Sequence, residues 1–406
     1  MKNKILKNNF VLLTASIIEK LIFFLITIFI ARKLGVVDYG KWGFALAFTS
    51  FFMIFTDLGL NTYSIREISK FKNRAQVYLS NLLILKVILS ILTLFFIIIF
   101  INIIKNPYDT TLTIYLLGIS FIFSSISGSF NSIFNAFQKM EFNAFSKIFN
   151  AILLFVLYMG SITLGYGIVG LATATIFVNI FMALINYGLL KKYFFRLKHK
   201  FSLNFAKNLF KNALPFGLNT IFSLVYFKID IIMLALLLKD NAAVGLYNAV
   251  TRLIVHSTFI PLILAQTIFP IMSLYHKRSK KPLNKLLKKS LKYAFLISIL
   301  ISLFVLIFAD KIILIVYGEQ FLQATNALRI LSIFYIFITL NIIIKTFLNS
   351  INKQRIVRNV ILFGAGLNIL LNFYFIPRYS YIGASITTLI SEIISFIIFY
   401  IYIKRY

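Results

Sequence analysis

The sequence contains no cysteine, which excludes disulfide bonds, thiolate metal sites and a cysteine nucleophile. It has only 3 His, and the wide spacing of His199, His256 and His276 does not suit a zinc site. No nucleotide-binding loop is found, so ATP is not expected to drive this chain from within. We therefore expect no catalytic residues, no metal site and no cofactor.

Charge is also scarce, and it is mostly of one sign. Charged residues make up 13% of the chain and hydrophobic ones 60%, whereas ordinary soluble domains hold about 25% charged and about 45–50% apolar residues. The apolar runs are continuous over about 20 residues, which is the length of a membrane-spanning helix, and they do not alternate as barrel strands do. The sequence therefore predicts an all-α polytopic membrane protein.

Twelve apolar segments can be counted as membrane spans. They cover residues 10–31, 43–65, 77–102, 111–137, 142–164, 168–190, 212–238, 245–272, 290–309, 322–349, 356–376 and 382–403. We expect the first to be a retained span rather than a signal peptide, because its apolar run is too long for a signal. An even number of spans places both termini on the same side of the membrane.

The basic residues predict which side that is. Connections on the side of the termini hold 29 of the 42 Lys and Arg, with Lys147 counted among them, and the opposite connections hold 7. Since cytoplasmic connections are enriched in Lys and Arg, both termini are predicted to be cytoplasmic in the cell membrane. The net charge of +31 then forms a belt that faces anionic lipid, so nucleic acid is not expected as a partner.

Weak internal repeats divide the chain into two halves, 1–205 and 206–406. "YGKWGFA" (39–45) matches "VGLYNAV" (244–250), with Gly40 aligned to Gly245. "NAFQK" (135–139) matches "NSINK" (349–353), and "YGIVGLATA" (166–174) matches "YSYIGASIT" (379–387), in the same order and at similar offsets. We predict two pseudo-symmetric six-helix bundles related by an axis along the membrane normal. Transporters that work by alternating access have such repeats, although an old duplication in another kind of protein would leave the same pattern.

Two long stretches carry a family resemblance. "ARKLGVVDYGKWGFALAFTSFFMIFTDLGLNTYSIREISK" (31–70) resembles the opening of the polysaccharide-exporter and O-antigen flippase (Wzx-type) family. "KIDIIMLALLLKDNAAVGLYNAVTRL" (228–253) is similar to its seventh-to-eighth span region. The family belongs to the multidrug/oligosaccharidyl-lipid/polysaccharide exporter superfamily. The resemblance implies a flippase, not an enzyme, that moves a polyprenyl-(pyro)phosphate-linked oligosaccharide from the inner to the outer leaflet. Membrane lipids and other polysaccharide assembly proteins are its candidate partners.

Charged residues inside the spans are the candidate site residues, because such residues are rare at membrane depth. Cations at that depth would stabilise the phosphate of a lipid-linked substrate. The candidates for this role in a central cavity are Lys20, Lys86, Lys228 and Arg252. The candidates for a coupling Na+ or proton site, or for counter-charges to these bases, are Glu19, Asp57 and Asp230.

Other interpretations stay open at this point. The same charges could form ion pairs that only fix helix packing. Ser120, Ser124, Gly128 and Ser132 lie on one face of the fourth span, which is typical of close helix contact and also suits a polar wall toward sugar. A cation-coupled multidrug antiporter would share the fold. A membrane-embedded glycan polymerase or ligase is disfavoured, because we find no large external loop.

Overall fold

The computed structural model describes the backbone of residues 2–197 and 200–404, and the side chains within 11–197, 200–217 and 228–404. No β-strand occurs in this described part. It holds nine helical stretches that are long and apolar enough to cross a membrane. Two of these, Val11–Lys70 and Gln354–Lys404, have 60 and 51 residues, enough for two crossings each at about 20 residues per crossing.

Both long stretches bend at a residue with a positive φ. Gly35 (φ 73°) lies inside α1 (Lys2–Met53), and Ser380 (φ 51°) lies inside α12 (Gln354–Lys404). With each stretch divided at its bend, and with the 36-residue α7 (Leu203–Leu238) added, the helices correspond to the twelve predicted spans. The all-α polytopic fold is confirmed, while the cytoplasmic placement of the termini stays a prediction.

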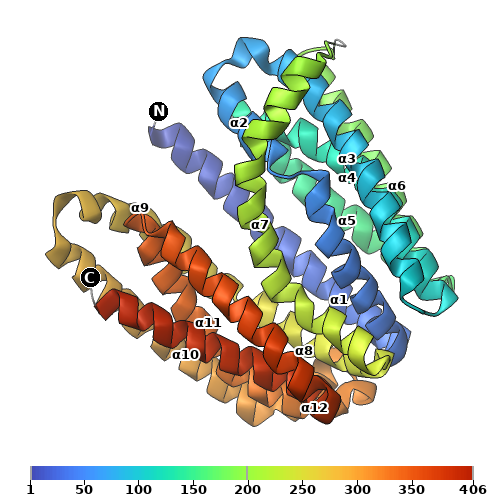
Figure 1. The fold of residues 1–406 in the computed structure, drawn as a ribbon, viewed down its shortest axis with the longest axis vertical. Coiled ribbons are helices and arrows are strands. Elements are labelled where there is room, and N and C mark those ends of the chain that lie inside the picture. Colours follow the sequence, from blue (N-terminus) through green and yellow to red (C-terminus); the bar gives the residue numbers. More distant parts are fainter. Residues whose placement is uncertain (1, 198–199, 405–406) are drawn as a thin grey trace. The chain divides into compact units, whose positions relative to one another are not determined.

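The chain forms two compact units. The first comprises the residues up to Leu34 and Phe44–Leu224. Its helices are most of α1, α2 (Leu60–Lys70), α3 (Ala75–Ile103), α4 (Tyr108–Ala136), α5 (Met140–Thr163), α6 (Gly167–Tyr193) and the first part of α7. In this unit α4 packs against both α3 and α6, and Figure 1 shows the three helices side by side.

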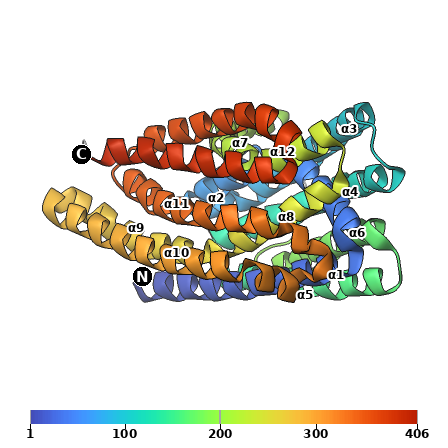
Figure 2. The same cartoon turned by 90° about the horizontal axis from the view of Figure 1, so that it is seen from below.

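The second unit comprises Gly35–Gly43 and the residues from Val225 onward. Its helices are the last part of α7, α8 (Asn241–Ser257), α9 (Phe259–Arg278), α10 (Lys280–Tyr317), α11 (Thr325–Ser350) and α12. Figure 2 shows α11 lying between α10 and α12, in agreement with its contacts to both. The chain passes from one unit to the other twice within α1, after Leu34 and after Gly43, and once within α7, after Leu224. The predicted sequence halves, 1–205 and 206–406, stay a prediction.

The second predicted span is broken near its middle. The helix passes through a 3-10 turn, Ile54–Thr56, after which Leu58 (φ 42°) and Gly59 (φ 83°) turn the chain into α2. Irregular backbone at membrane depth needs protein around it, because lipid offers no hydrogen bonds. Here α7 supplies that cover, since a Cβ on Gly217 would lie 2.5 Å from the carbonyl carbon of Leu58.

A second close backbone approach joins two helices of the second unit. A Cβ on Gly40 would collide with the backbone of Asn241 in α8 and would lie 2.8 Å from the backbone nitrogen of Gly245. A Cβ on Gly245 would in turn collide with the carbonyl of Val36. Only glycine permits this spacing. The two glycines that match in the sequence repeat therefore contact each other in the structure.

Candidate functional site

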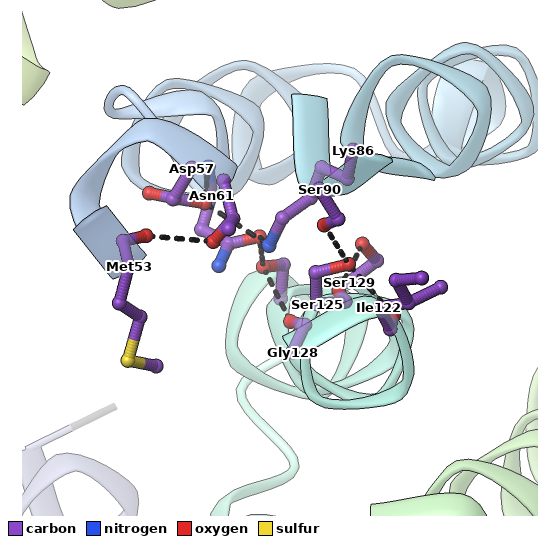
Figure 3. Close-up of polar contacts among 11 residues, drawn as sticks. Met53, Asp57, Asn61, Lys86, Ser90, Ile122, Ser125, Gly128 and Ser129 are labelled. Carbon is purple, nitrogen blue, oxygen red and sulfur yellow. Dashed lines mark hydrogen bonds and ion pairs between the residues drawn. The ribbon is translucent and has the colours of Figure 1, made fainter. Parts of the chain in front are cut away.

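Lys86 is the centre of a buried polar cluster at the break in the second span (Figure 3). It extends from α3, and its Nζ lies 3.1 Å from Oδ1 of Asp57 and donates a 3.0 Å hydrogen bond to Oδ1 of Asn61. From α4, Ser132 donates to the same oxygen of Asn61 at 3.0 Å. The Lys86 side chain is 2% exposed and that of Asp57 is 33% exposed. The positive charge of Lys86 is thus compensated within the first unit.

Glu19 also has a basic partner in the first unit, although not the one adjacent in sequence. Nζ of Lys147 in α5 lies 3.2 Å from Oε2 of Glu19 and donates to Oγ of Ser16 at 3.2 Å. Lys147 therefore belongs to a helix and not to a connection, which corrects its place in the charge count. The Lys20 side chain is exposed, and its phosphate-binding role stays a prediction.

The Glu19–Lys147 pair lies in the wall of a polar cavity of about 440 Å³ within the first unit. The rest of the wall, as far as its side chains are described, is neutral, and it comes from α1, α4, α5 and α6. Most of these are amides and hydroxyls: Ser16, Ser124, Ser127, Asn131, Asn135, Asn143, Ser146, Asn150 and Asn179. Ser124 and Gly128, from the predicted small-residue face of the fourth span, belong to this wall.

Asp230 occupies a contrasting site in the second unit. Its side chain is buried and accepts hydrogen bonds from Tyr247 OH at 2.7 Å, Thr388 Oγ1 at 2.9 Å and Asn372 Nδ2 at 2.6 Å. The amide of Asn372 also donates to Asn368 Oδ1 at 3.0 Å. Among the residues whose side chains the structure describes, no basic group forms an ion pair with Asp230. The carboxylate is surrounded by neutral donors instead.

Lys228 and Arg252 lie near each other in the same unit. The Lys228 ammonium is close enough to the Arg252 guanidinium for their positive charges to repel. Arg252 Nε donates a 3.2 Å hydrogen bond to Oδ1 of Asn248, one helical turn before it. Neither cation forms an ion pair with a carboxylate in the described part of the chain. Two bases that repel each other in this way have the charge that a phosphate group needs.

The sequence missed the partners that surround these charges. The positions of Asn61, Lys147, Tyr247, Asn372 and Thr388 become significant only once the helices are packed. A further buried acid, Glu392 in α12, accepts from Asn341 at 2.8 Å and lies 4.0 Å from Lys345. These partners could have been suspected from the Asn and Thr residues within the predicted spans, because polar side chains there usually form hydrogen bonds to another helix.

Comparison with known proteins places these features in a family. Residues 5–276 match the family model described as polysaccharide biosynthesis protein, and residues 215–374 match the model described as MatE. The chain is 24% identical over 406 residues to the capsular polysaccharide biosynthesis protein CapF of Staphylococcus aureus, covering 98% of this chain and 99% of CapF. It is 24% identical over 200 residues to a probable low-salt glycan biosynthesis flippase, Agl15, of Haloferax volcanii, covering 47% and 42% of the two chains.

Solved structures share the fold. The lipid II flippase MurJ in an inward closed conformation superimposes with a TM-score of 0.81 at 16% identity, covering 96% of this chain and 87% of MurJ. An inward-facing multidrug resistance MATE family transporter superimposes with a TM-score of 0.76 at 17% identity, covering 94% of each chain. At these identities the likeness concerns the fold alone. Because one family model matches two thirds of its length, the chain belongs to the polysaccharide biosynthesis protein family of the multidrug/oligosaccharidyl-lipid/polysaccharide exporter superfamily.

Proposed function

We propose that this protein is a flippase, not an enzyme, that moves a polyprenyl-(pyro)phosphate-linked oligosaccharide from the cytoplasmic to the outer leaflet of the cell membrane. Both termini face the cytoplasm, and the two units alternate access to the substrate. Its family membership supports this proposal, as do relatives named for capsular polysaccharide biosynthesis and for glycan flipping. The carrier's long apolar tail stays in lipid while the polar headgroup crosses through protein.

The single observation that carries the proposal is the family match over residues 5–276, and the cations Lys228 and Arg252 of the second unit supply the charge that such a substrate needs. A phosphate or diphosphate is costly to place at membrane depth unless positive charge compensates it. Since these two bases repel each other, and no described carboxylate is ion-paired with either, an anionic headgroup would relieve their repulsion. The planar guanidinium of Arg252 can bind a phosphate through two parallel hydrogen bonds.

The test is a leaflet-accessibility assay with the full chain in vesicles. A polyprenyl-diphosphate-linked oligosaccharide is placed in one leaflet, and its arrival in the other is followed by a glycan-modifying enzyme that cannot cross the membrane. We expect transfer within minutes in vesicles with protein and none in protein-free vesicles. Equal transfer in both would refute the proposal.

Asp230 is the acid that we propose for the coupling cation, either Na+ or a proton. Glu19 and Asp57 each have a lysine within 3.2 Å, which supports a counter-charge role for them. The described hydrogen-bond partners of Asp230 are all neutral, and the oxygens of Asn368, Asn372 and Thr388 beside it suit a hard cation. Applying Na+ and pH gradients in the same assay distinguishes the two ions, and indifference of the rate to both would end this part of the proposal.

A cation-coupled multidrug antiporter remains the second candidate function. The observation that favours it is the MatE match over residues 215–374, which includes Asp230. Export of a fluorescent monovalent aromatic cation from the vesicles tests it directly. The flippase proposal expects no gradient-driven export of this dye, because the paired bases Lys228 and Arg252 repel a cation.

A further inference from the structure

The amide-lined cavity of the first unit has a chemistry that the phosphate proposal does not use. Five Asn side chains from three helices face it: Asn131 and Asn135 from α4, Asn143 and Asn150 from α5, and Asn179 from α6. Its volume of about 440 Å³ falls within the range of small-molecule sites, about 300–1,000 Å³. So many amides around one space are unexpected in a wall that only packs helices together.

The charges in this cavity compensate each other. Glu19 and Lys147 form an ion pair at 3.2 Å, and every other lining residue whose side chain the structure describes is neutral. Lys86, which lies beyond Gly128, does not add charge to the space. Its ammonium is paired with Asp57, although a Cβ on Gly128 would lie only 3.6 Å from it. The described charges of this cavity therefore give little electrostatic attraction to an anionic headgroup, in contrast to those of Lys228 and Arg252.

The amide oxygens of two of these Asn side chains accept no hydrogen bond from the described residues. Asn143 donates to Asn135 Oδ1 at 2.7 Å, and Asn179 donates to the backbone oxygen of Ser120 at 3.3 Å, so these side chains are held by protein. The Oδ1 atoms of Asn131 and Asn150 are shielded from solvent and accept no hydrogen bond from the described part of the chain. Buried polar atoms are nearly always bonded, so two orphan acceptors in one cavity wall point to a ligand.

The missing partner must be a hydrogen-bond donor. Hydroxyl and acetamido N–H groups of a sugar donate hydrogen bonds, whereas an ionised phosphate only accepts them. Both side chains line the cavity, where a sugar hydroxyl can approach their amides. No aromatic ring lines the cavity among the described residues, so hydrogen bonds rather than ring stacking would hold the sugar. Such modest binding suits a transporter, because the sugar must be released on the other side.

We propose that this cavity is the glycan-binding subsite of the flippase, with Asn131 and Asn150 as its specificity-determining residues. The inference rests on the proposed function, and it assigns the two parts of the substrate to different groups of residues. The sugar donates to amides of this cavity, while the phosphate is left to the bases named in the proposed function.

The test compares two ligands on the purified full chain. One is the lipid-linked oligosaccharide fraction of the native membrane, and the other is polyprenyl diphosphate without sugar. The variants are Asn131→Leu, Asn150→Leu and the double change, which keep the side-chain size but remove the amide. Asn102→Leu, at an exposed position near the end of α3, is the matched control.

We expect the wild-type chain to bind the glycosylated lipid more tightly than the bare lipid. The double variant should lose roughly tenfold in affinity for the glycosylated lipid, as the loss of two neutral hydrogen bonds predicts, and should bind the bare lipid unchanged. Equal wild-type affinity for both lipids, or an equal loss for both in the double variant, overturns the subsite. Failure of the wild-type chain to bind either lipid overturns the proposed function itself.

A second measurement does not depend on how well the leucine variants fold. Because the chain has no cysteine, Asn131→Cys and Asn150→Cys each introduce a single thiol for a maleimide reagent. We expect the glycosylated lipid to slow labelling of both thiols at least threefold, the bare lipid to leave the rates unchanged, and Asn102→Cys to respond to neither. Protection by both lipids alike, or by neither, contradicts the assignment.

Discussion

The two units differ in how the charged side chains of their membrane-spanning helices are compensated. In the first unit, Asp57 and Glu19 each lie within 3.2 Å of a lysine, Lys86 and Lys147 respectively. In the second unit, Asp230 is surrounded by hydroxyls and amides, and no described base is ion-paired with it. The bases Lys228 and Arg252 repel each other and have no carboxylate partner in the described part.

The difference is between charges that are neutralised by a counter-charge within the protein and charges that have no such partner among the described residues. In a buried ion pair the two opposite charges neutralise each other, so the pair can contribute to helix packing without a bound ligand or ion. A buried charge without a counter-charge is unfavourable, so a protein that keeps it gains from any ion that binds there. On this basis we propose that the ion pairs of the first unit maintain the fold and that the second unit binds ions. Glu392, which has Lys345 at 4.0 Å, shows that the second unit also contains a paired acid.

The largest expected effect on stability comes from breaking the pair around Lys86. Asp57→Asn leaves the 2% exposed ammonium without its counter-charge. We expect a loss of about 3 kcal/mol in the free energy of unfolding, near the low end for a broken buried pair because Asp57 itself keeps contact with solvent. Thermal unfolding in detergent measures this.

The control for that change removes both charges. Asp57→Asn combined with Lys86→Met should recover most of the lost stability, because no unpaired charge remains. If the double variant is as unstable as Asp57→Asn alone, the pair is not the reason for the loss.

A change of shape at constant charge tests the phosphate site. Arg252→Lys keeps the positive charge but loses the planar fork that can bind a phosphate twice. We expect roughly tenfold weaker binding of sugar-free polyprenyl diphosphate, which corresponds to one lost charge-assisted hydrogen bond. Arg329→Lys, at an exposed side chain paired with Asp310, is the matched control and should bind normally.

The change from Asp to Asn, which should destabilise the first unit at Asp57, should have only a small effect on stability at Asp230 in the second unit. Asp230→Asn removes a charge that has no described ion-pair partner, so we expect the free energy of unfolding to change by less than about 1 kcal/mol. The response of the transport rate to a Na+ or pH gradient should disappear. A stability loss like that of Asp57→Asn would show that Asp230 has a structural role.

The smallest effect is expected at the cavity pair. Glu19 and Lys147 are 25% and 42% exposed, so the pair resembles a surface ion pair more than a buried one. Glu19→Gln should lower the free energy of unfolding by about 0.5 kcal/mol, and the difference from wild type should shrink in high salt. A larger loss of unfolding free energy that does not depend on salt would show that this pair behaves like the buried Asp57–Lys86 pair.

The sequence predicted the fold well because the signals for it are local. Apolar runs of membrane-spanning length gave the helices, and the repeat gave Gly40 and Gly245, which lie against each other in the structure. The polar partners could not be predicted in the same way. Asp57 reaches Lys86 only because the second span breaks at Leu58 and Gly59, and no pattern in the sequence marks that turn as buried.

The cavity shows the same limit. Asn131 and Asn135 precede a connection, and Asn143 and Asn150 follow it, so their convergence depends on how α4 and α5 pack. Lys147 was counted with the cytoplasmic connections because it lies near a predicted span end, and only the packing of α5 shows its pairing with Glu19. The sequence singled out the charged residues within the spans, whereas their partners follow from tertiary structure.

The most direct test of the account is the initial rate of lipid-linked oligosaccharide transfer in vesicles for two double variants. Asp57→Asn with Lys86→Met removes a compensated pair, and Lys228→Met with Arg252→Met removes the uncompensated cations. We predict a rate within about threefold of wild type for the first and a loss of roughly 100-fold for the second, as two lost charge-assisted contacts imply. Equal rates for the two variants, or the larger loss for the first, would contradict the account.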